Sequence, residues 1–301
     1  MITLPTLRQF RHLAALAEHR HFGKAAAASA VTQSTLSASI KELEETLGVS
    51  LVDRTKRSVV FTPFGEETVR RAQTIIDETE ELARSAQSAG KPLSGTIRMG
   101  VIPTVGPFLL PRVLGKLRAK YPALRLYLRE DLTDRLIDKL KSGELDVVLL
   151  ALPYETGALE TETLFEDRFS FCCRADHPLA NTPVVAAERL KDESLLLLED
   201  GHCLRDHALA ACDLRERAQR APFEATSLGT LVQMVDNGLG VTLVPQLAID
   251  AGILKGTDLI AIPLEDAGAT RQIGLAWRAR TGRRAEFELL ARELKRLAGR
   301  K

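Results

Sequence analysis

Two cysteines, Cys203 and Cys212, stand in a part of the sequence that could support redox chemistry. Cys203 follows His202 and precedes Arg205 in the stretch Glu199-Asp200-Gly201-His202-Cys203-Leu204-Arg205-Asp206, which leads into a helix-like run. Cationic neighbours and a helix N-terminus both stabilise a thiolate. We therefore predict that Cys203 is a reactive thiol.

The spacing of Cys203 and Cys212 indicates what such a thiol could be used for. If the residues between them form a helix, a rise of about 1.5 Å per residue places the two Cα atoms roughly 13 Å apart. A disulfide requires Cα atoms within about 7 Å. A bond between them would therefore require this segment to unfold, and Cys212 could resolve a sulfenic acid formed on Cys203. The alternative interpretation is that both are small core residues.

The remaining cysteines, Cys172 and Cys173, are adjacent and are expected to pack on a strand. The chain contains no Cys-x-x-Cys, so the usual zinc-ligand spacing is missing and no metal or cofactor is predicted. Four histidines that lack metal-ligand spacing are interpreted as structural or exposed: His19, His21, His177 and His207.

Composition indicates a multidomain chain with a balanced charge. Its 301 residues, 45% of them apolar, suffice for two or more domains with separate cores. The net charge of +1 means that any contact with nucleic acid must come from a local basic surface. The N-terminus lacks a signal-peptide pattern, and no apolar run approaches the roughly 18 residues of a membrane span. We therefore expect a cytoplasmic protein without membrane contact.

Residues 1–65 have the pattern of a winged helix-turn-helix domain. The helix Thr6–His19 precedes a short helix Gly23–Ala30 and, after a turn, the helix Gln33–Glu44. Such a second helix can enter the major groove of double-stranded DNA, and residues 51–62 resemble a basic two-stranded wing. Seven side chains are candidates for DNA contact, with Gln33 suited to reading adenine and Lys41 to binding phosphate: Gln33, Ser34, Thr35, Ser37, Lys41, Arg54 and Arg57.

A linker helix is predicted over Glu66–Gln87, within a linker region of residues 66–90. A narrow apolar seam on an otherwise polar surface fits packing against a second copy of the chain. The seam comprises Val69, Ala72, Ile75, Ile76, Leu82, Ala83 and Ala86. Packing of this helix on its own domain is the alternative.

Residues 91–301 alternate between strand and helix patterns, which predicts a doubly wound α/β domain. Strands are expected at Thr96–Ile102, Arg125–Leu128 and Val147–Leu150, with helices at Leu109–Lys120 and Thr133–Ser142. Glu166–Arg174 and Arg271–Arg278 are expected to cross between two lobes. Lobe I then comprises about 91–165 and 268–301, and lobe II about 166–267. Further elements are expected at Leu195–Leu198, Phe223–Ala225, Leu228–Asn237, Val241–Val244 and Ala285–Ala298.

The N-terminal motif resembles that of the LysR-type transcriptional regulators. The resemblance is carried by Ala25-Ala26, Gln33 to Ser37, Ile40, Leu43-Glu44, Leu47-Gly48, Leu51, Arg54, Thr62 and Gly65. It implies a winged helix-turn-helix, a dimerising linker helix and a two-lobed effector domain similar to periplasmic binding proteins. Ser34 departs from the proline found in many members, which affects the expected base preference but not the fold.

Two further stretches, Gly100–Pro111 and Leu198–Asp206, resemble the hydrogen-peroxide-sensing OxyR branch of this family. The gap between Cys203 and Cys212 and the run Ala225-Thr226-Ser227-Leu228 are similar to it as well. The resemblance implies that Cys203 is the peroxidatic thiol and Cys212 the resolving one. By the same resemblance, the residues that surround the peroxide are Thr104, Thr133, His202, Asp206 and Arg271. Helix capping is the alternative role for the two threonines.

The resemblance implies a redox-responsive regulator of oxidative-stress genes rather than an enzyme. Its expected partners are promoter DNA, RNA polymerase, hydrogen peroxide, glutaredoxin or thioredoxin as reductant, and further copies of itself in a dimer and a tetramer. One alternative is a LysR-type regulator that binds an organic effector in the cleft between the lobes. Two more distant alternatives are a thiol peroxidase with a DNA-binding appendage and a transport-type binding protein.

Overall fold

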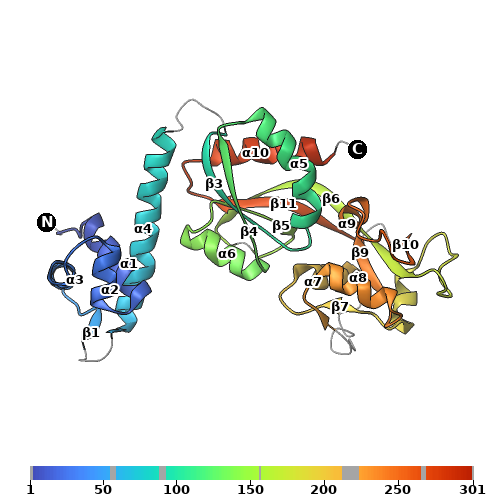
Figure 1. The fold of residues 1–301 in the computed structure, drawn as a ribbon, viewed down its shortest axis with the longest axis horizontal. Coiled ribbons are helices and arrows are strands. Elements are labelled where there is room, and N and C mark those ends of the chain that lie inside the picture. Colours follow the sequence, from blue (N-terminus) through green and yellow to red (C-terminus); the bar gives the residue numbers. More distant parts are fainter. Residues whose placement is uncertain are drawn as a thin grey trace. The chain divides into compact units, whose positions relative to one another are not determined.

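The computed structural model describes residues 3–54, 59–87, 93–155, 157–211, 224–265 and 269–299. The chain divides into two compact units. The first consists of Met1–Ala89 with Ser142–Glu144, and the second of Gly90–Lys141 with Leu145–Lys301. Figure 1 shows the helical first unit and the mixed α/β second unit.

The first unit has the winged helix-turn-helix arrangement expected from the sequence. It comprises α1 (Leu7–His19), α2 (Phe22–Ala28), α3 (Gln33–Leu47), β1 (Val52–Arg54), β2 (Val59–Phe61) and α4 (Pro63–Gln87). Thr6 forms a capping box with Gln9 at the start of α1, and Thr32 caps α3 through the backbone N–H of Thr35. Leu13, Leu16, Leu36, Ile40 and Leu43 form the core between the helices.

Three predicted helix bounds of this unit differ from the observed ones by two residues or more. The second helix ends at Ala28 instead of Ala30, because Ala30 takes the left-handed conformation with φ of 53°. The recognition helix α3 continues to Leu47 and ends at Gly48, where φ is 70° and glycine is favoured. The linker helix α4 begins at Pro63 instead of Glu66, since proline fits the first helical turn.

The apolar seam of α4 divides into a buried and an exposed part. Ala72 and Ile76 are 1% and 6% exposed and pack inside the unit, where α4 contacts α1. Ile75 and Leu82 are instead 41% and 71% exposed. Packing of the seam on its own domain is therefore confirmed for Ala72 and Ile76, while packing against a second copy stays a prediction for the residues left on the surface.

The second unit is built on a seven-stranded sheet in the order β10-β6-β11-β5-β3-β4, with β9 paired to β6. Lobe I contains β3 (Gly95–Val101), α5 (Gly106–Lys120), β4 (Leu124–Glu130), α6 (Thr133–Ser142), β5 (Val147–Leu152) and α10 (Arg284–Ala298). α5 connects β3 to β4, and α6 connects β4 to β5, which lies on the other side of β3 in the sheet. Figure 1 shows the two helices on opposite faces of the sheet. The core of lobe I lies between these layers.

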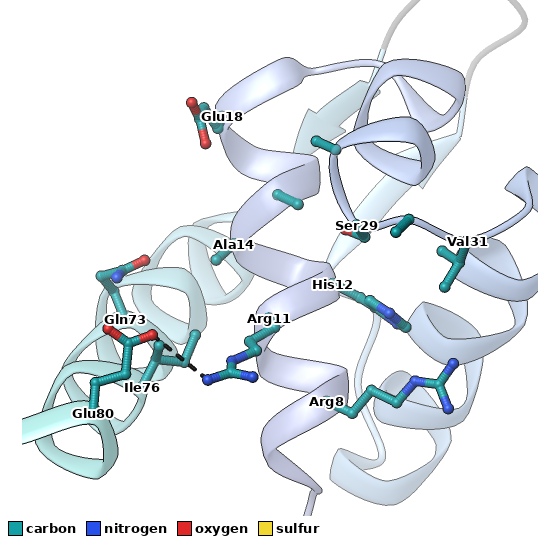
Figure 2. Close-up of a pocket in the computed structure, with 13 residues that line it drawn as sticks. Arg8, Arg11, His12, Ala14, Glu18, Ser29, Val31, Gln73, Ile76 and Glu80 are labelled. Carbon is teal, nitrogen blue, oxygen red and sulfur yellow. Dashed lines mark ion pairs between the residues drawn. The ribbon is translucent and has the colours of Figure 1, made fainter. Parts of the chain in front are cut away.

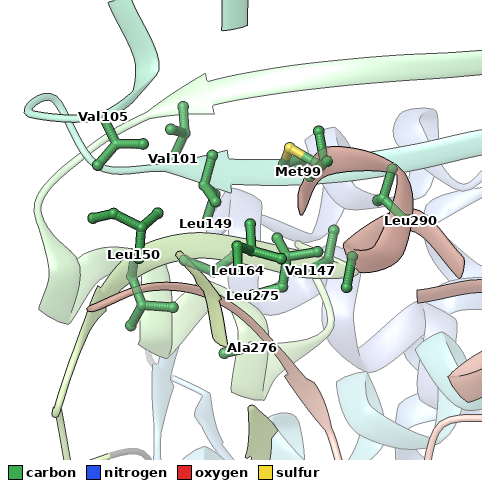
Figure 3. Packing of buried hydrophobic residues seen from close by; sticks show 14 of the residues in the cluster. Met99, Val101, Val105, Val147, Leu149, Leu150, Leu164, Leu275, Ala276 and Leu290 are labelled. Carbon is green, nitrogen blue, oxygen red and sulfur yellow. The ribbon is translucent and has the colours of Figure 1, made fainter. Parts of the chain in front are cut away.

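Figure 3 shows part of that core, in which Met99 of β3 lies on the side toward Leu290 of α10 and Leu149 of β5 lies nearer Val101. All six residues of β5 are buried. This agrees with its uninterrupted apolar run, which is typical of a strand covered on both faces. The core therefore fixes the strand ends near which the candidate redox site lies.

Two long strands cross between the lobes, as the sequence predicted. β6 (Leu159–Arg174) pairs with β11 (Thr270–Arg278) in lobe I and continues into lobe II, where it pairs with β9 and β10. β6 begins seven residues before the predicted Glu166, because its first half already pairs with β11. Cys172 and Cys173 lie on this strand as buried free thiols.

Lobe II contains short elements around a second core. They are a 3-10 helix (Ala187–Asp192), β7 (Leu197–Leu198), α7 (Cys203–Ala211), β8 (Glu224–Ala225), α8 (Leu228–Asp236), β9 (Thr242–Pro245), α9 (Gln246–Asp250) and β10 (Leu259–Pro263). The sequence did not predict the 3-10 helix, α9 or β10. Each is only five or six residues long, so its apolar pattern is too short to indicate an element.

Candidate functional site

A tight turn positions Cys203 at the start of α7. Gly201 has a φ of 94°, a conformation that favours glycine, and the chain then enters the helix at Cys203. The helix N-terminus directs backbone N–H groups toward this end, which favours negative charge there. The predicted helical run after Cys203 is confirmed through Ala211.

The Cys203 side chain is a free thiol that packs into the core of lobe I, although α7 belongs to lobe II. It is 6% exposed. Burial raises the pKa of the Cys203 thiol. Three groups act in the opposite direction and lower this pKa: the charge of Arg271, the Thr133 hydroxyl and the backbone N–H of Ala151. The resting form is therefore the protonated thiol, held where a developing thiolate would be stabilised.

Arg271 is the cation of this site and is held by two residues. Its Nε and Nη2 donate hydrogen bonds to Asp167 Oδ2 at 3.0 and 2.9 Å. Its Nη1 donates to Thr104 Oγ1 at 2.9 Å, and Nη2 also donates to the Thr104 carbonyl at 3.1 Å. The guanidinium is thus fixed in position by the lobe crossing and by the loop that follows β3.

Thr104 and Thr133 do not cap helices, so the alternative role considered for them is wrong. Thr104 bonds Arg271, and no side chain caps α5. Thr133 Oγ1 is buried and has no hydrogen-bond partner among the nitrogen and oxygen atoms of the described residues. Its interaction with the Cys203 sulfur lowers the pKa of that thiol. Both hydroxyls therefore belong to the site.

The sequence neighbours of Cys203 act differently from the prediction. Burial lowers the pKa of His202, whose ring lies 3.9 Å from Glu199 Oε1 and bonds the backbone of Thr226. Arg205 pairs with Asp200 at 3.2 Å and donates to the Leu198 carbonyl. Neither is among the groups that lower the pKa of Cys203. The expectation that these adjacent cations hold a thiolate is therefore wrong, because the relevant cation comes from β11.

The other predicted site residues occupy different positions. Asp206 is exposed in the first turn of α7, and its charge raises the pKa of Cys203. Cys212 lies outside the described residues, directly after the end of α7 at Ala211. Eight helical steps from Cys203 to Ala211 span about 12 Å. The structure therefore brings Thr104, Thr133 and Arg271 to Cys203, while the pairing with Cys212 stays a prediction.

Three contributors to this site were missed in the sequence: Asp167, Tyr154 and His207. Asp167 is a carboxylate at a buried position of β6, directly opposite Arg271 in the strand register. Tyr154 donates a hydrogen bond to Asp134, and burial together with this carboxylate raises its pKa. His207 follows Cys203 by one helical turn, a spacing that could have indicated its position.

The candidate DNA interface lies at the start of α3. Gln33, Ser34, Thr35 and Lys41 are exposed and Ser37 is half-buried. Thr32 Oγ1 lies 2.9 Å from Ser34 Oγ and 2.8 Å from Thr35 Oγ1, and Lys41 lies 3.5 Å from Glu45. Arg54 is the last residue of β1, whereas Arg57 lies outside the described residues. The polar N-terminus of α3 is thus accessible to a duplex.

A hollow of about 740 Å³ lies beside this interface, between α1, the end of α2 and α4. Figure 2 shows that Arg11 and Glu80 reach across it, and their side chains are 3.5 Å apart. His12 Nδ1 lies 2.8 Å from Ser39 Oγ and so connects α1 to α3. The hollow carries both signs of charge. The His12–Ser39 contact holds α3 against α1, and the Arg11–Glu80 pair joins α1 to α4.

Comparison with known protein families identifies both parts of the chain. Residues 7–66 match the family described as bacterial regulatory helix-turn-helix protein, lysR family, and residues 90–299 match the LysR substrate binding domain. The chain belongs to the LysR family of transcriptional regulators. These proteins are regulators rather than enzymes, and the helix-turn-helix binds DNA.

Individual relatives extend over nearly the whole chain. The transcriptional dual regulator OxyR of Escherichia coli K12 is 41% identical over 96% of this chain and 94% of its own length. The regulator EstR of Acinetobacter baylyi is 38% identical over 99% of this chain and 98% of its own length. A full-length OxyR mutant from Pseudomonas aeruginosa has a TM-score of 0.79 at 36% identity, covering 99% of this chain and 96% of that one. A hydrogen-peroxide-bound OxyR mutant from Corynebacterium glutamicum has a TM-score of 0.68 at 35% identity, covering 99% of this chain and 94% of that one.

Among the described helices, none combines the length and apolar character needed to cross a lipid bilayer. The same described residues contain no cluster of three or more His, Cys, Asp or Glu side chains that could hold a metal ion.

Proposed function

We propose that this LysR-family regulator senses hydrogen peroxide through reversible disulfide formation between Cys203 and Cys212 and controls oxidative-stress genes. The observation that carries the proposal is the position of the free Cys203 thiol. It is buried against the Thr133 hydroxyl, the Ala151 N–H and the charge of Arg271. The similarity to OxyR proteins, one of them bound to hydrogen peroxide, supports it.

The surrounding groups suit a small neutral oxidant. The Thr133 hydroxyl has an unused hydrogen-bonding capacity that peroxide could take up, and Thr104 presents a second hydroxyl beside Arg271. Arg271 would stabilise both the thiolate and the hydroxide that departs from the peroxide. His202 and Asp206 would complete the site at the start of α7.

The proposed reaction has two steps. The Cys203 sulfur attacks one peroxide oxygen, the O–O bond breaks, and the departing hydroxide takes up the thiol proton to form water. Cys203 is then a sulfenic acid. The Cys212 thiol attacks this sulfur, so that a disulfide forms and a second water leaves.

The disulfide step would change the structure of α7. Eight helical steps separate Cys203 from Ala211 by about 12 Å, whereas a disulfide needs Cα atoms within about 7 Å. The helix would therefore have to unfold, and the Cys203 side chain would have to leave the lobe I core. This change would alter how effector domains pair, and with it the spacing of the DNA-binding units and the contact with RNA polymerase. Glutaredoxin or thioredoxin would restore the thiols.

The exposed part of the α4 seam supports association with another copy of the chain. Ile75 and Leu82 are large apolar side chains on the surface of α4, and such residues on a long helix favour packing against a partner helix. We infer a dimer through α4 and a tetramer formed from two dimers. This assembly would act on promoter DNA in the cytoplasm.

Counting free thiols before and after stoichiometric peroxide tests the proposed function. We expect the full-length protein to lose two thiols, and Cys212→Ser to stop at a sulfenic acid on Cys203. Peptide mapping should show a Cys203–Cys212 bond in the oxidised parent protein. An unchanged thiol count at micromolar peroxide would contradict the proposal.

A regulator that responds to an organic effector is the second candidate. It is favoured by the similarity to EstR over 99% of the chain, since the name of that relative does not refer to peroxide. In this case the cavity of about 560 Å³ lined by Tyr154, Thr163 and Arg271 would hold an organic molecule, and Cys203 would be a packing residue. Unchanged DNA binding after peroxide treatment, together with unchanged thiols, would favour this candidate.

A further inference from the structure

His207 lies one helical turn after Cys203 on α7. Side chains four residues apart on a helix lie on the same face, with Cβ atoms about 5–6 Å apart. His207 therefore shares the face of α7 that carries Cys203 toward lobe I. The positive charge of Arg271 lowers the pKa of both side chains, and the His207 ring contacts the Pro153 carbonyl of lobe I.

The hydrogen bond of the His207 ring fixes its tautomer. His207 Nε2 lies 3.1 Å from the carbonyl oxygen of Pro153. A carbonyl oxygen can only accept a hydrogen bond, so Nε2 must carry the ring proton. The other ring nitrogen, Nδ1, then holds an unprotonated lone pair.

This Nδ1 lone pair is buried and unused. Among the described residues, no atom forms a hydrogen bond with His207 Nδ1. A buried polar atom without a partner costs about 1–3 kcal/mol, so native proteins contain few of them. Burial and the nearby Arg271 also lower the pKa of His207, which keeps the ring neutral and Nδ1 available as a base.

Such a base would accelerate the chemistry proposed for Cys203. Burial keeps the sulfur in its thiol form, so its proton must leave as the sulfur attacks peroxide. Arg271 carries only donors, and a threonine hydroxyl is a very weak base. His202 bonds the Thr226 backbone. His207 Nδ1 is the buried acceptor that can take the proton.

We propose that His207 is the general base of the peroxide reaction at Cys203, an inference that rests on the proposed function. Nδ1 accepts the thiol proton while the sulfur electron pair forms the S–O bond and the O–O bond of peroxide breaks. The resulting imidazolium returns the proton to the departing hydroxide, which leaves as water. Cys203 is oxidised to a sulfenic acid, peroxide is reduced, and His207 ends neutral.

Rates of sulfenic acid formation test this role in full-length protein that carries Cys212→Ser. This background stops the reaction after the first step, and trapping with dimedone followed by mass spectrometry measures it. His207→Gln keeps a donor for the Pro153 carbonyl but removes the base. We expect its second-order rate constant with peroxide at pH 7 to fall about 100-fold, within the range known for general acid–base catalysis. The matched control is His177→Gln, which removes a ring paired with Glu193 at 3.2 Å in lobe II and should keep the parent rate.

The pH profile separates a base from a packing residue. Among the described residues, the charges that act on the His207 ring are those of Asp206 on α7 and Arg271 on β11, and Cys203 lies one turn earlier on the same helix. In the parent, the rate should fall at acidic pH as Nδ1 becomes protonated. In His207→Gln it should follow only the small thiolate fraction and rise steadily with pH.

The outcomes distinguish this inference from the function on which it rests. A parent that forms no sulfenic acid would refute the proposed sensing function. A parent that forms it at the same rate as His207→Gln would overturn the role of His207 and leave the sensing function intact. The parent also provides a measurement that needs no variant at His207: we expect its rate to fall in D₂O, and an unchanged rate would contradict proton transfer to a base.

Discussion

Arg271 and Asp167 form a buried ion pair between neighbouring strands. Arg271 Nη2 lies 2.9 Å from Asp167 Oδ2, and the two side chains are 0% and 2% exposed. The other carboxylate oxygen of Asp167 accepts a hydrogen bond from the Leu247 backbone at 2.8 Å. The pair therefore connects β11 to β6 and to the start of α9, and it holds the guanidinium beside Cys203.

We expect Asp167→Ala to destabilise the protein strongly. Removing one partner of a buried ion pair leaves an uncompensated charge, which costs about 3–5 kcal/mol. Urea denaturation should measure a decrease of this size in the free energy of unfolding. Glu166→Ala is the matched control, because Glu166 pairs with Arg168 at 3.3 Å on the surface of the same strand. Surface pairs contribute about 0–1 kcal/mol, so an equal effect of both variants would contradict the prediction.

The sequence predicted the two lobes and the crossing strands because long apolar runs with regular spacing specify strands and helices. It also predicted Thr104, Thr133 and Arg271 as neighbours of Cys203, through the family resemblance. In the structure Arg271 bonds Thr104, and Arg271 and Thr133 act on the Cys203 thiol, while their role toward peroxide stays a prediction. The short elements of lobe II, α9 and β10, carry too few residues to produce a pattern.

The charge state of Cys203 could not be predicted because it depends on contacts that are distant in the sequence. His202 and Arg205 suggested a thiolate, but burial in the core of another lobe raises the pKa of the Cys203 thiol. Asp167 was missed for the same reason, since its partner Arg271 stands 104 positions later. Local sequence therefore pointed to Cys203 as a candidate, and the fold determined its electrostatic surroundings.

We expect Thr133→Val to lower the reactivity of Cys203 without loss of stability. The hydroxyl lowers the pKa of the Cys203 thiol, so its removal should raise that pKa and slow alkylation by iodoacetamide at pH 8. The same hydroxyl has no nitrogen or oxygen partner among the described residues. Replacing it with a methyl group should therefore leave the unfolding free energy unchanged or up to about 1 kcal/mol higher.

Thr242→Val is the control for this variant. Thr242 is also buried, but its hydroxyl donates to the Leu196 carbonyl at 2.9 Å in lobe II. Its loss leaves a buried carbonyl without that donor and should cost about 1–3 kcal/mol, while the alkylation rate of Cys203 stays the same. Faster or unchanged alkylation in Thr133→Val would contradict the role given to this hydroxyl.

Cys172 and Cys173 should make stability fall at alkaline pH. Burial raises the pKa of Cys172 to about 12 and that of Cys173 to about 11. In the unfolded chain both thiols ionise near pH 8.5. The folded state therefore retains protons that the unfolded state releases, and this contribution to stability, complete below about pH 8.5, is lost as the pH rises toward 11 and 12.

Urea denaturation between pH 7 and 10 measures this effect. The double variant Cys172→Ala, Cys173→Ala should show a shallower decline of the unfolding free energy than the parent above pH 8.5. Each thiol contributes a slope of at most about 1.36 kcal/mol per pH unit. Parallel curves for the two proteins would show that these cysteines do not titrate as their burial requires.

Lys41 should contribute to DNA affinity without contributing to sequence preference. It is exposed on α3 and lies 3.5 Å from Glu45, which neutralises part of its charge. If Lys41 binds a phosphate, Lys41→Ala should weaken binding to any duplex, and the slope of log affinity against log salt should decrease by about 1. Glu45→Ala removes the competing carboxylate and should tighten binding with the slope unchanged.

Fluorescence anisotropy with a labelled duplex of arbitrary sequence, titrated at several salt concentrations, measures both variants. Because a base-reading residue would affect one sequence and leave the salt slope unaltered, an unchanged slope for Lys41→Ala would remove this lysine from the phosphate contacts.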